Sequence, residues 1–224
     1  SSFAPEILFS ISRDEQRYKK QLINQDGVDI WNIHELFWVD KKGHAYHDEV
    51  SIHIPAQSPN TVESKSLKLF INSLIHQRFV NLDDVKNVIK LHLERLLDAE
   101  ISIGKVHNKV TTSHHQVITN SELKLLFTTK GQTKLKGFRG FRSLCPVTSQ
   151  PDIAEIFIDG NIHDKDLDRV SSYLGSFFKR ECFHELCIEY IYSDLIKAGF
   201  DIKKVEGYFE RRGGIAIIPI RYSQ

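Results

Sequence analysis

The chain has 224 residues, 41% of them hydrophobic and 26% charged, which is typical of a globular protein and argues against disorder. The 30 Lys and Arg residues nearly balance 29 Asp and Glu residues, so the net charge of +1 gives no reason to expect direct binding to nucleic acid. The 3 cysteines do not make a disulfide framework, and no apolar stretch is as long as a membrane span. We therefore expect a cytoplasmic protein.

The first half of the chain predicts strands, a helix pair and further strands. Aromatic and β-branched residues predict strands, while apolar residues at helical spacing and Asn81 as an N-cap predict helices. The expected elements are an arm over residues 1–27 whose charged run faces solvent, strands over 29–40 and 45–55, helices over 64–77 and 82–97, a strand over 101–110 and a candidate strand over 123–127.

The second half repeats this order of elements. The expected elements are a strand over 153–158, helices over 164–179 and 184–198, and strands over 205–211 and 215–220 about a turn at Gly213 and Gly214. Helix pairs packed on antiparallel sheets define the α+β class, and the repetition indicates a duplicated module. The basic segment 130–142, with three glycines, reads as a solvated loop, with a phosphate-facing loop as the alternative.

The stretch Cys145–Asp152 carries a thiol and a carboxylate on a connector stiffened by Pro146 and Pro151. A thiol attacks only as the thiolate, and a nearby carboxylate can accept its proton and return it later. We therefore predict Cys145 as a nucleophile and Asp152 as its proton partner. The alternative is a structural loop with an inert cysteine.

Three further stretches are candidates for binding. Residues 62–68 join a strand to a helix, where Ser64 could cap the helix, or Glu63 and the lysines could bind a polar ring and an anion. Phe183–Glu185 offers an aromatic ring, an imidazole and a carboxylate, which suit a planar heterocycle; the alternative is an ordinary helix start. Arg211–Gly214 is either a phosphate contact or a plain hairpin turn.

A metal site is also worth weighing, because Cys145, Cys182, Cys187 and His184 are all possible zinc ligands. No pair of them has the two-residue spacing of a zinc knuckle, and Cys182 and Cys187 do not share one face of a helix. We therefore expect no metal.

Together these stretches resemble a known family. Glu63–Phe70 (ESKSLKLF), Cys145–Asp152 (CPVTSQPD), Phe183–Glu185 (FHE) and Arg211–Gly214 (RRGG) are similar, in this order, to the signatures of the NADPH-dependent 7-cyano-7-deazaguanine reductases. These enzymes are nitrile reductases of queuosine biosynthesis, a tRNA modification pathway. The resemblance implies two tandem tunnelling-fold modules, each with an antiparallel sheet and a helix pair on one face, at residues 29–112 and 113–224 after an N-terminal arm at 1–28.

The resemblance also implies roles for single residues. Cys145 would form a covalent thioimide with the nitrile, with Asp152 and His184 as further catalytic residues, and two NADPH would complete the reduction. The remaining implied contacts are with the deazaguanine substrate through Val62, Glu63, Ser64, Phe183, His184 and Glu185, and with NADPH through Ser64, Lys65, Arg212 and Gly213. The resemblance further implies a homodimer.

Two alternatives remain at this point. The first is a zinc-dependent pterin or GTP cyclohydrolase or synthase of the same fold, for which stoichiometric zinc in the purified protein would be diagnostic. The second is a purine-binding module without catalysis, in which Cys145 is merely structural. The chain is also shorter than most two-module members of the family, both at its N-terminus and before Cys145, which bears on dimer contacts more than on the chemistry.

Overall fold

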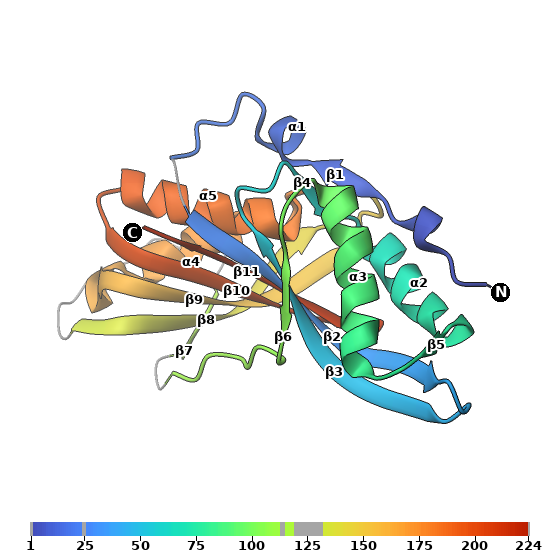
Figure 1. Cartoon of the computed structure of the whole chain (residues 1–224). Coiled ribbons are helices and arrows are strands. Elements are labelled where there is room, and N and C mark those ends of the chain that lie inside the picture. Colours follow the sequence, from blue (N-terminus) through green and yellow to red (C-terminus); the bar gives the residue numbers. More distant parts are fainter. Residues whose placement is uncertain (1, 24–25, 113–114, 119–131, 224) are drawn as a thin grey trace. The chain divides into compact units, whose positions relative to one another are not determined.

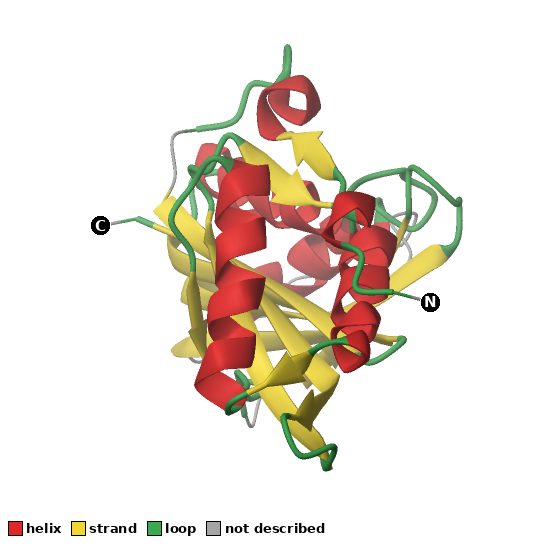
Figure 2. Ribbon diagram, turned by 45° about the vertical axis from the view of Figure 1, so that its right-hand side comes forward, coloured by secondary structure: helices red, strands yellow, loops and turns green. Residues whose placement is uncertain are grey.

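The computed structural model describes residues 2–23, 26–112, 115–118 and 132–223, and the fold is α+β, as predicted. The described strands and helices belong to two compact units (Figures 1 and 2). The first unit contains Ser1–Lys19, Val28–His107 and Arg211–Ala216, and the second contains Lys20–Gly27, Asn108–Glu210 and Ile217–Gln224. No helix among the described residues is both long and apolar enough to cross a membrane.

The first unit is built on a long hairpin. Strands β2 (Asp26–Asp40) and β3 (Ala45–Pro55) pair antiparallel, which confirms the predicted hairpin. On its other side β3 pairs with β6 (Ser102–Gly104), so the strand expected over 101–110 is much shorter than predicted. A two-residue strand, β5 (Arg78–Phe79), runs parallel to the end of β2.

Two helices cover one face of this hairpin (Figures 1 and 2). Helix α2 (Ser64–Ser73) continues into the 3-10 turn η2 (Leu74–His76), and α3 (Leu82–Leu97) follows. Asn81 caps α3, because its Oδ1 accepts a hydrogen bond from the backbone N–H of Asp84 at 2.9 Å. Both predicted helices are therefore confirmed. Their buried apolar side chains include Leu67, Phe70, Ile71, Val85, Ile89 and Leu93.

The N-terminal arm has more structure than its sequence indicates. Its elements are η1 (Pro5–Ile7), β1 (Ser10–Ser12) and α1 (Arg13–Arg17). Strand β1 pairs with β4 (Asn60–Val62). Arg13 is 1% exposed and forms an ion pair with Asp29 at 2.6 Å, so the prediction of a wholly solvated charged run is wrong at this residue. The buried guanidinium is retained because a carboxylate neutralises it.

The described strands of the second unit lie in the order β7 (His115–Val117), β8 (Gln132–Leu144), β9 (Pro151–His163), β10 (Asp201–Arg212) and β11 (Ile215–Tyr222). Strand β8 pairs antiparallel with β9 from Gln132 to Leu144, so the loop predicted over 130–142 is instead a strand wherever it is described. Lys136 within it is 1% exposed and pairs with Asp164 at 2.9 Å. The candidate strand over 123–127 lies outside the described residues.

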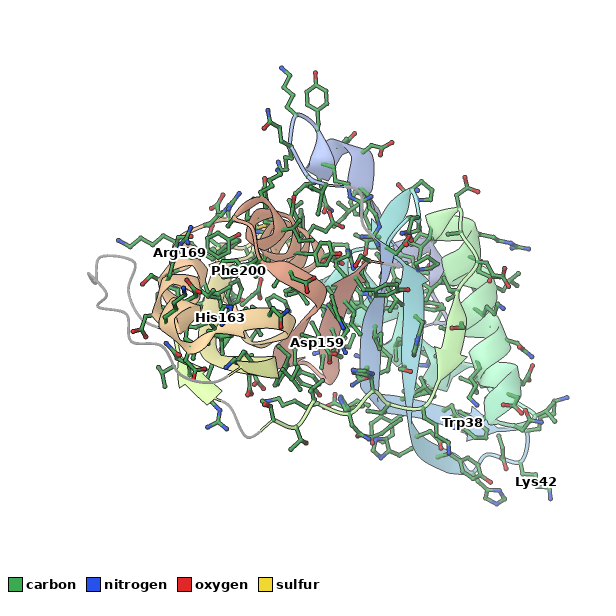
Figure 3. All side chains as sticks on the ribbon, turned by 90° about the vertical axis from the view of Figure 1, so that its left-hand side faces the viewer. Trp38, Lys42, Asp159, His163, Arg169 and Phe200 are labelled. Carbon is green, nitrogen blue, oxygen red and sulfur yellow. The ribbon has the colours of Figure 1, made fainter. Side chains whose placement is uncertain are left out.

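Helices α4 (Leu167–Gly175) and α5 (His184–Lys197) lie on one face of these strands (Figure 1). The helix predicted from 164 begins as the 3-10 turn η3 (Asp164–Asp166), and the helix predicted from 184 is confirmed. Figure 3 shows the side chains of Arg169, on α4, and Phe200, after α5, next to each other, with the guanidinium 5.9 Å from the ring centroid.

Candidate active site

Cys145 opens the loop that joins β8 to β9. The last pair of the two strands is Leu144 opposite Pro151, and two backbone hydrogen bonds close the loop beyond it. The N–H of Cys145 donates to the carbonyl of Gln150, and the N–H of Ser149 donates to the carbonyl of Cys145, each at 2.8 Å. Both backbone groups of Cys145 are therefore held, while its side chain stays partly exposed.

Asp152 lies two residues past the loop, on β9 and opposite Ser143. It is 5% exposed, and its Oδ2 lies 3.4 Å from Nε2 of His184, the first residue of α5. A carboxylate and an imidazole at this separation can share or pass a proton. The structure thus places the predicted proton partner of Cys145 beside a second titratable group.

Backbone hydrogen bonds place the segment before α5 beside the end of β8. Leu144 donates its N–H to the carbonyl of Arg180, and its own carbonyl accepts from the N–H of Cys182, each at 2.9 Å. The side chain of Ser149 adds a contact to the carboxylate of Glu181 at 3.2 Å. Residues 180–182 therefore run alongside the end of β8, and α5 starts two residues later. The thiol and the start of the helix are anchored to the same residue.

The start of α5 presents the three residues predicted to bind a heterocycle. Phe183 is the N-cap residue and is half-buried, and Glu185 is 3% exposed. The ring of His184 stands edge-on to the ring of Phe209, with 4.7 Å between centroids. This contact restricts the imidazole. Phe209 was not predicted from the sequence, where it is one apolar residue among many in β10.

The other two thiols are inaccessible. Cys182 is 3% and Cys187 0% exposed, and burial, followed by the nearby Cys182 thiol, raises the pKa of Cys187 well above the usual range. Cys145 is the one cysteine with solvent access, which is what a nucleophile needs. Across the described ranges, no three His, Cys, Asp or Glu side chains are arranged to hold a metal ion.

Val62, Glu63, Ser64 and Lys65 belong to the first unit. Val62 is 2% exposed, whereas Ser64 and Lys65 are exposed in the first turn of α2. Glu63, and not Ser64, caps this helix: its carboxylate accepts from the backbone N–H of Lys65 at 2.9 Å and of Ser66 at 2.7 Å. A carboxylate has about four acceptor positions, so Glu63 retains capacity for a ligand.

The turn at Gly213 and Gly214 also belongs to the first unit. Both residues have positive φ, 55° and 80°, which favours glycine. A side chain at Gly213 would collide with Lys68 of α2, and one at Gly214 would collide with Glu35 of β2. Because Lys68 follows Ser64 by one helical turn, the predicted cofactor residues Ser64, Lys65 and Gly213 lie in the same part of this unit. Arg212 ends β10, and its side chain is outside the described part of the structure.

The described site residues thus form two groups. Cys145, Asp152 and Phe183–Glu185 belong to the second unit, and Val62–Lys65 and Gly213 to the first. The first group has the components of covalent catalysis: an accessible thiol and a proton-carrying pair. The second has an exposed helix start and a glycine turn, which are features suited to a phosphate-bearing ligand.

Comparison with known proteins identifies the family of the chain. Residues 1–106 match the family described as nitrile reductase, 7-cyano-7-deazaguanine-reductase N-term, and residues 151–224 match the family described as QueF-like protein. NADPH-dependent 7-cyano-7-deazaguanine reductases of Desulfotalea psychrophila and Bordetella avium are 33% and 32% identical to the chain. The alignments cover 98% of the chain and 88% of the first relative, and 99% of the chain and 89% of the second.

These matches place the chain among the oxidoreductases. It belongs to the family of NADPH-dependent 7-cyano-7-deazaguanine reductases.

Proposed function

We propose that this chain reduces 7-cyano-7-deazaguanine to 7-aminomethyl-7-deazaguanine in queuosine biosynthesis. The observation that supports this most directly is the accessible Cys145, whose loop between β8 and β9 is closed by backbone hydrogen bonds. Asp152, which contacts His184, lies on the same pair of strands. A nitrile accepts hydride poorly until a nucleophile adds to its carbon, and a positioned thiol is suited to that step.

The proposed covalent step is the addition of the Cys145 thiol across the C≡N bond of the nitrile. The sulfur of Cys145 bonds to the nitrile carbon, one π pair of the C≡N bond moves to nitrogen, and the nitrogen gains a proton, which gives a thioimide. The thiol proton passes to Asp152, which returns it to the nitrogen. His184, 3.4 Å from that carboxylate, holds or exchanges the same proton. Restoring the thiolate later in the cycle requires the C–S bond to break.

The cofactor is proposed to bind at Ser64, Lys65, Arg212 and Gly213. When bound, NADPH supplies one hydride per molecule, so that a nitrile requires two molecules to become an amine. The residues present fit this group: Lys65 is exposed in the first turn of α2, where cationic and N–H groups favour phosphate, and the side chain of Lys68 lies against Gly213 and brings a second cation to the turn. The sequence has no Gly-x-Gly-x-x-Gly fingerprint, so this is not a Rossmann site.

The substrate contacts are proposed for Val62, Glu63, Ser64 and Phe183–Glu185. The carboxylates of Glu63 and Glu185 suit the N–H edge of a guanine-like ring, and the ring of Phe183 can stack on its face. Glu185 is 3% exposed, which favours a short and specific contact over a solvated one.

For the molecule as a whole, we propose two tandem tunnelling-fold modules at residues 29–112 and 113–224 after the arm at 1–28. Each unit supports this with antiparallel strands and a pair of helices on one face. We also propose a homodimer in the cytoplasm that does not itself bind nucleic acid. All three cysteines are free thiols, which suits a reducing compartment.

Intact-mass spectrometry without NADPH tests the covalent step. Wild-type protein mixed with the nitrile should gain the mass of one substrate molecule, because the thioimide cannot proceed further without hydride. Cys145→Ala should show no gain, whereas Cys182→Ala, which removes a buried thiol, should still form the adduct. The absence of any adduct on the wild-type protein would contradict the proposal.

Asp152→Asn tests the proton path. The amide keeps the shape of the carboxylate but cannot take the thiol proton, so we expect adduct formation to slow by about 10²-fold while nitrile binding is retained. Stopped-flow absorbance would measure the rate, and titration calorimetry the binding. Adduct formation at the wild-type rate would show that Asp152 has no part in proton transfer.

A further inference from the structure

Strand β2 contains a bulge next to the glycine turn. Ile33 lies opposite Val50 and Leu36 opposite Asp48, so β2 has one more residue than β3 over this interval. Bulges redirect side chains and are frequent beside functional sites. Here the extra residue falls at His34 or Glu35, and Glu35 is exposed.

The bulge is bonded to the turn through its backbone. The N–H of His34 donates to the carbonyl of Gly214 at 2.8 Å. Two further contacts hold His34. Its side-chain Nδ1 lies 2.8 Å from the carboxylate of Glu49, and its backbone carbonyl accepts from the ring of His47, also at 2.8 Å. The bulge is thus a rigid support and the turn is attached to it.

The side chain of Glu35 lies directly on the turn. A Cβ atom added to Gly214 would come within 2.7 Å of Cγ, 2.5 Å of Cδ and 2.6 Å of Oε2 of Glu35. From the other side, the side chain of Lys68 occupies the space where a Cβ of Gly213 would stand. Two consecutive glycines are the most flexible dipeptide a chain can have, and here a side chain from β2 and one from α2 restrain it.

We propose that Glu35 is a positioning residue of the cofactor site, which acts by holding the Gly213–Gly214 turn and thereby the backbone of Arg212. This inference rests on the proposed function, in which Arg212 and Gly213 contact NADPH. A group that is held in its binding conformation loses less entropy when the ligand binds. Loss of the Glu35 contact should therefore weaken the affinity for NADPH and leave the affinity for the nitrile unchanged.

Steady-state kinetics of Glu35→Ala and Glu35→Gln test the proposal. Glu35→Ala should raise KM for NADPH by about tenfold, with kcat and KM for the nitrile within about twofold of wild type. Glu35→Gln preserves the shape that packs on Gly214 and should restore KM for NADPH to within about twofold. Glu100→Gln, a neutralised exposed carboxylate in the same unit, is the matched control, and Arg212→Ala is the positive control.

A double-mutant cycle makes the test specific to the turn. Gly214→Ala alone should raise KM for NADPH, because its methyl group displaces the Glu35 side chain from the turn and its φ of 80° is unfavourable for alanine. Adding Glu35→Ala should then cause little further change, because the contact is already lost. Additive effects, or an unchanged KM for NADPH in Glu35→Ala, would overturn the role of Glu35. Wild-type protein that does not oxidise NADPH with the nitrile would overturn the proposed function, and this inference with it.

Discussion

Cys145→Ala is expected to lower kcat for nitrile reduction by at least about 10³-fold, the largest effect of any single substitution in this chain. The substitution removes the only atom proposed to bond to the substrate. It should leave the fold intact, because Cys145 is partly exposed and its structural contacts are made by its backbone N–H and carbonyl, which alanine retains. NADPH oxidation followed by absorbance would measure the loss.

Two controls separate chemistry from structure in that experiment. Titration calorimetry should show that Cys145→Ala still binds the deazaguanine nitrile, and its thermal unfolding should match the wild type. Cys182→Ala should retain turnover, since that thiol is 3% exposed and has no access to substrate. If Cys145→Ala kept more than about a tenth of the wild-type kcat, covalent catalysis at this residue would be excluded.

Arg221→Met should lower the free energy of unfolding by about 3–5 kcal/mol. Arg221 on β11 is fully buried, and its guanidinium donates to the carboxylate of Glu189 on α5 at 2.9 and 3.3 Å. Removing one partner leaves the other as a buried charge without its counterion, and that desolvation is what destabilises the protein. Urea denaturation followed by circular dichroism would measure the change.

The double variant Arg221→Met with Glu189→Leu should lose less stability than the sum of the two single variants, because it buries no uncompensated charge. The exposed pair of Lys86 and Asp83, 3.1 Å apart on α3, is the matched control: Lys86→Met should change the free energy of unfolding by no more than about 1 kcal/mol. Equal effects of Arg221→Met and Lys86→Met would show that the buried pair is not a stabilising element.

The sequence predicts local structure well where one face of an element is apolar. The hairpin at 29–55 and helix α3 with its Asn81 cap follow from alternation, from helical spacing and from cap chemistry, all of which act between residues close in the chain. Cys145 and Asp152 could be selected for the same reason, because the pairing proposed for them needs only a short, stiff connector. The heterocycle on which they are proposed to act follows from the family and not from any spacing.

The structural predictions that were wrong depend on contacts that periodicity does not reveal. The segment now seen as β8 is basic and rich in glycine, and it is a strand because β9 pairs along it and because Lys136 finds Asp164, 28 residues away. Arg13 is buried for the same reason, through Asp29. At α2, Glu63 displaces Ser64 as the cap because its longer side chain reaches two backbone N–H groups at once. None of these partners can be identified from periodicity.

Leu144, which precedes Cys145, holds the approach to α5 through its backbone N–H and carbonyl. Any amino acid except proline could form these two bonds. The side chain at Leu144 can therefore vary without breaking the two bonds that hold residues 180–182, and with them the start of α5, beside the end of β8. A search for distant relatives should then require the residues proposed to react and tolerate variation at Leu144.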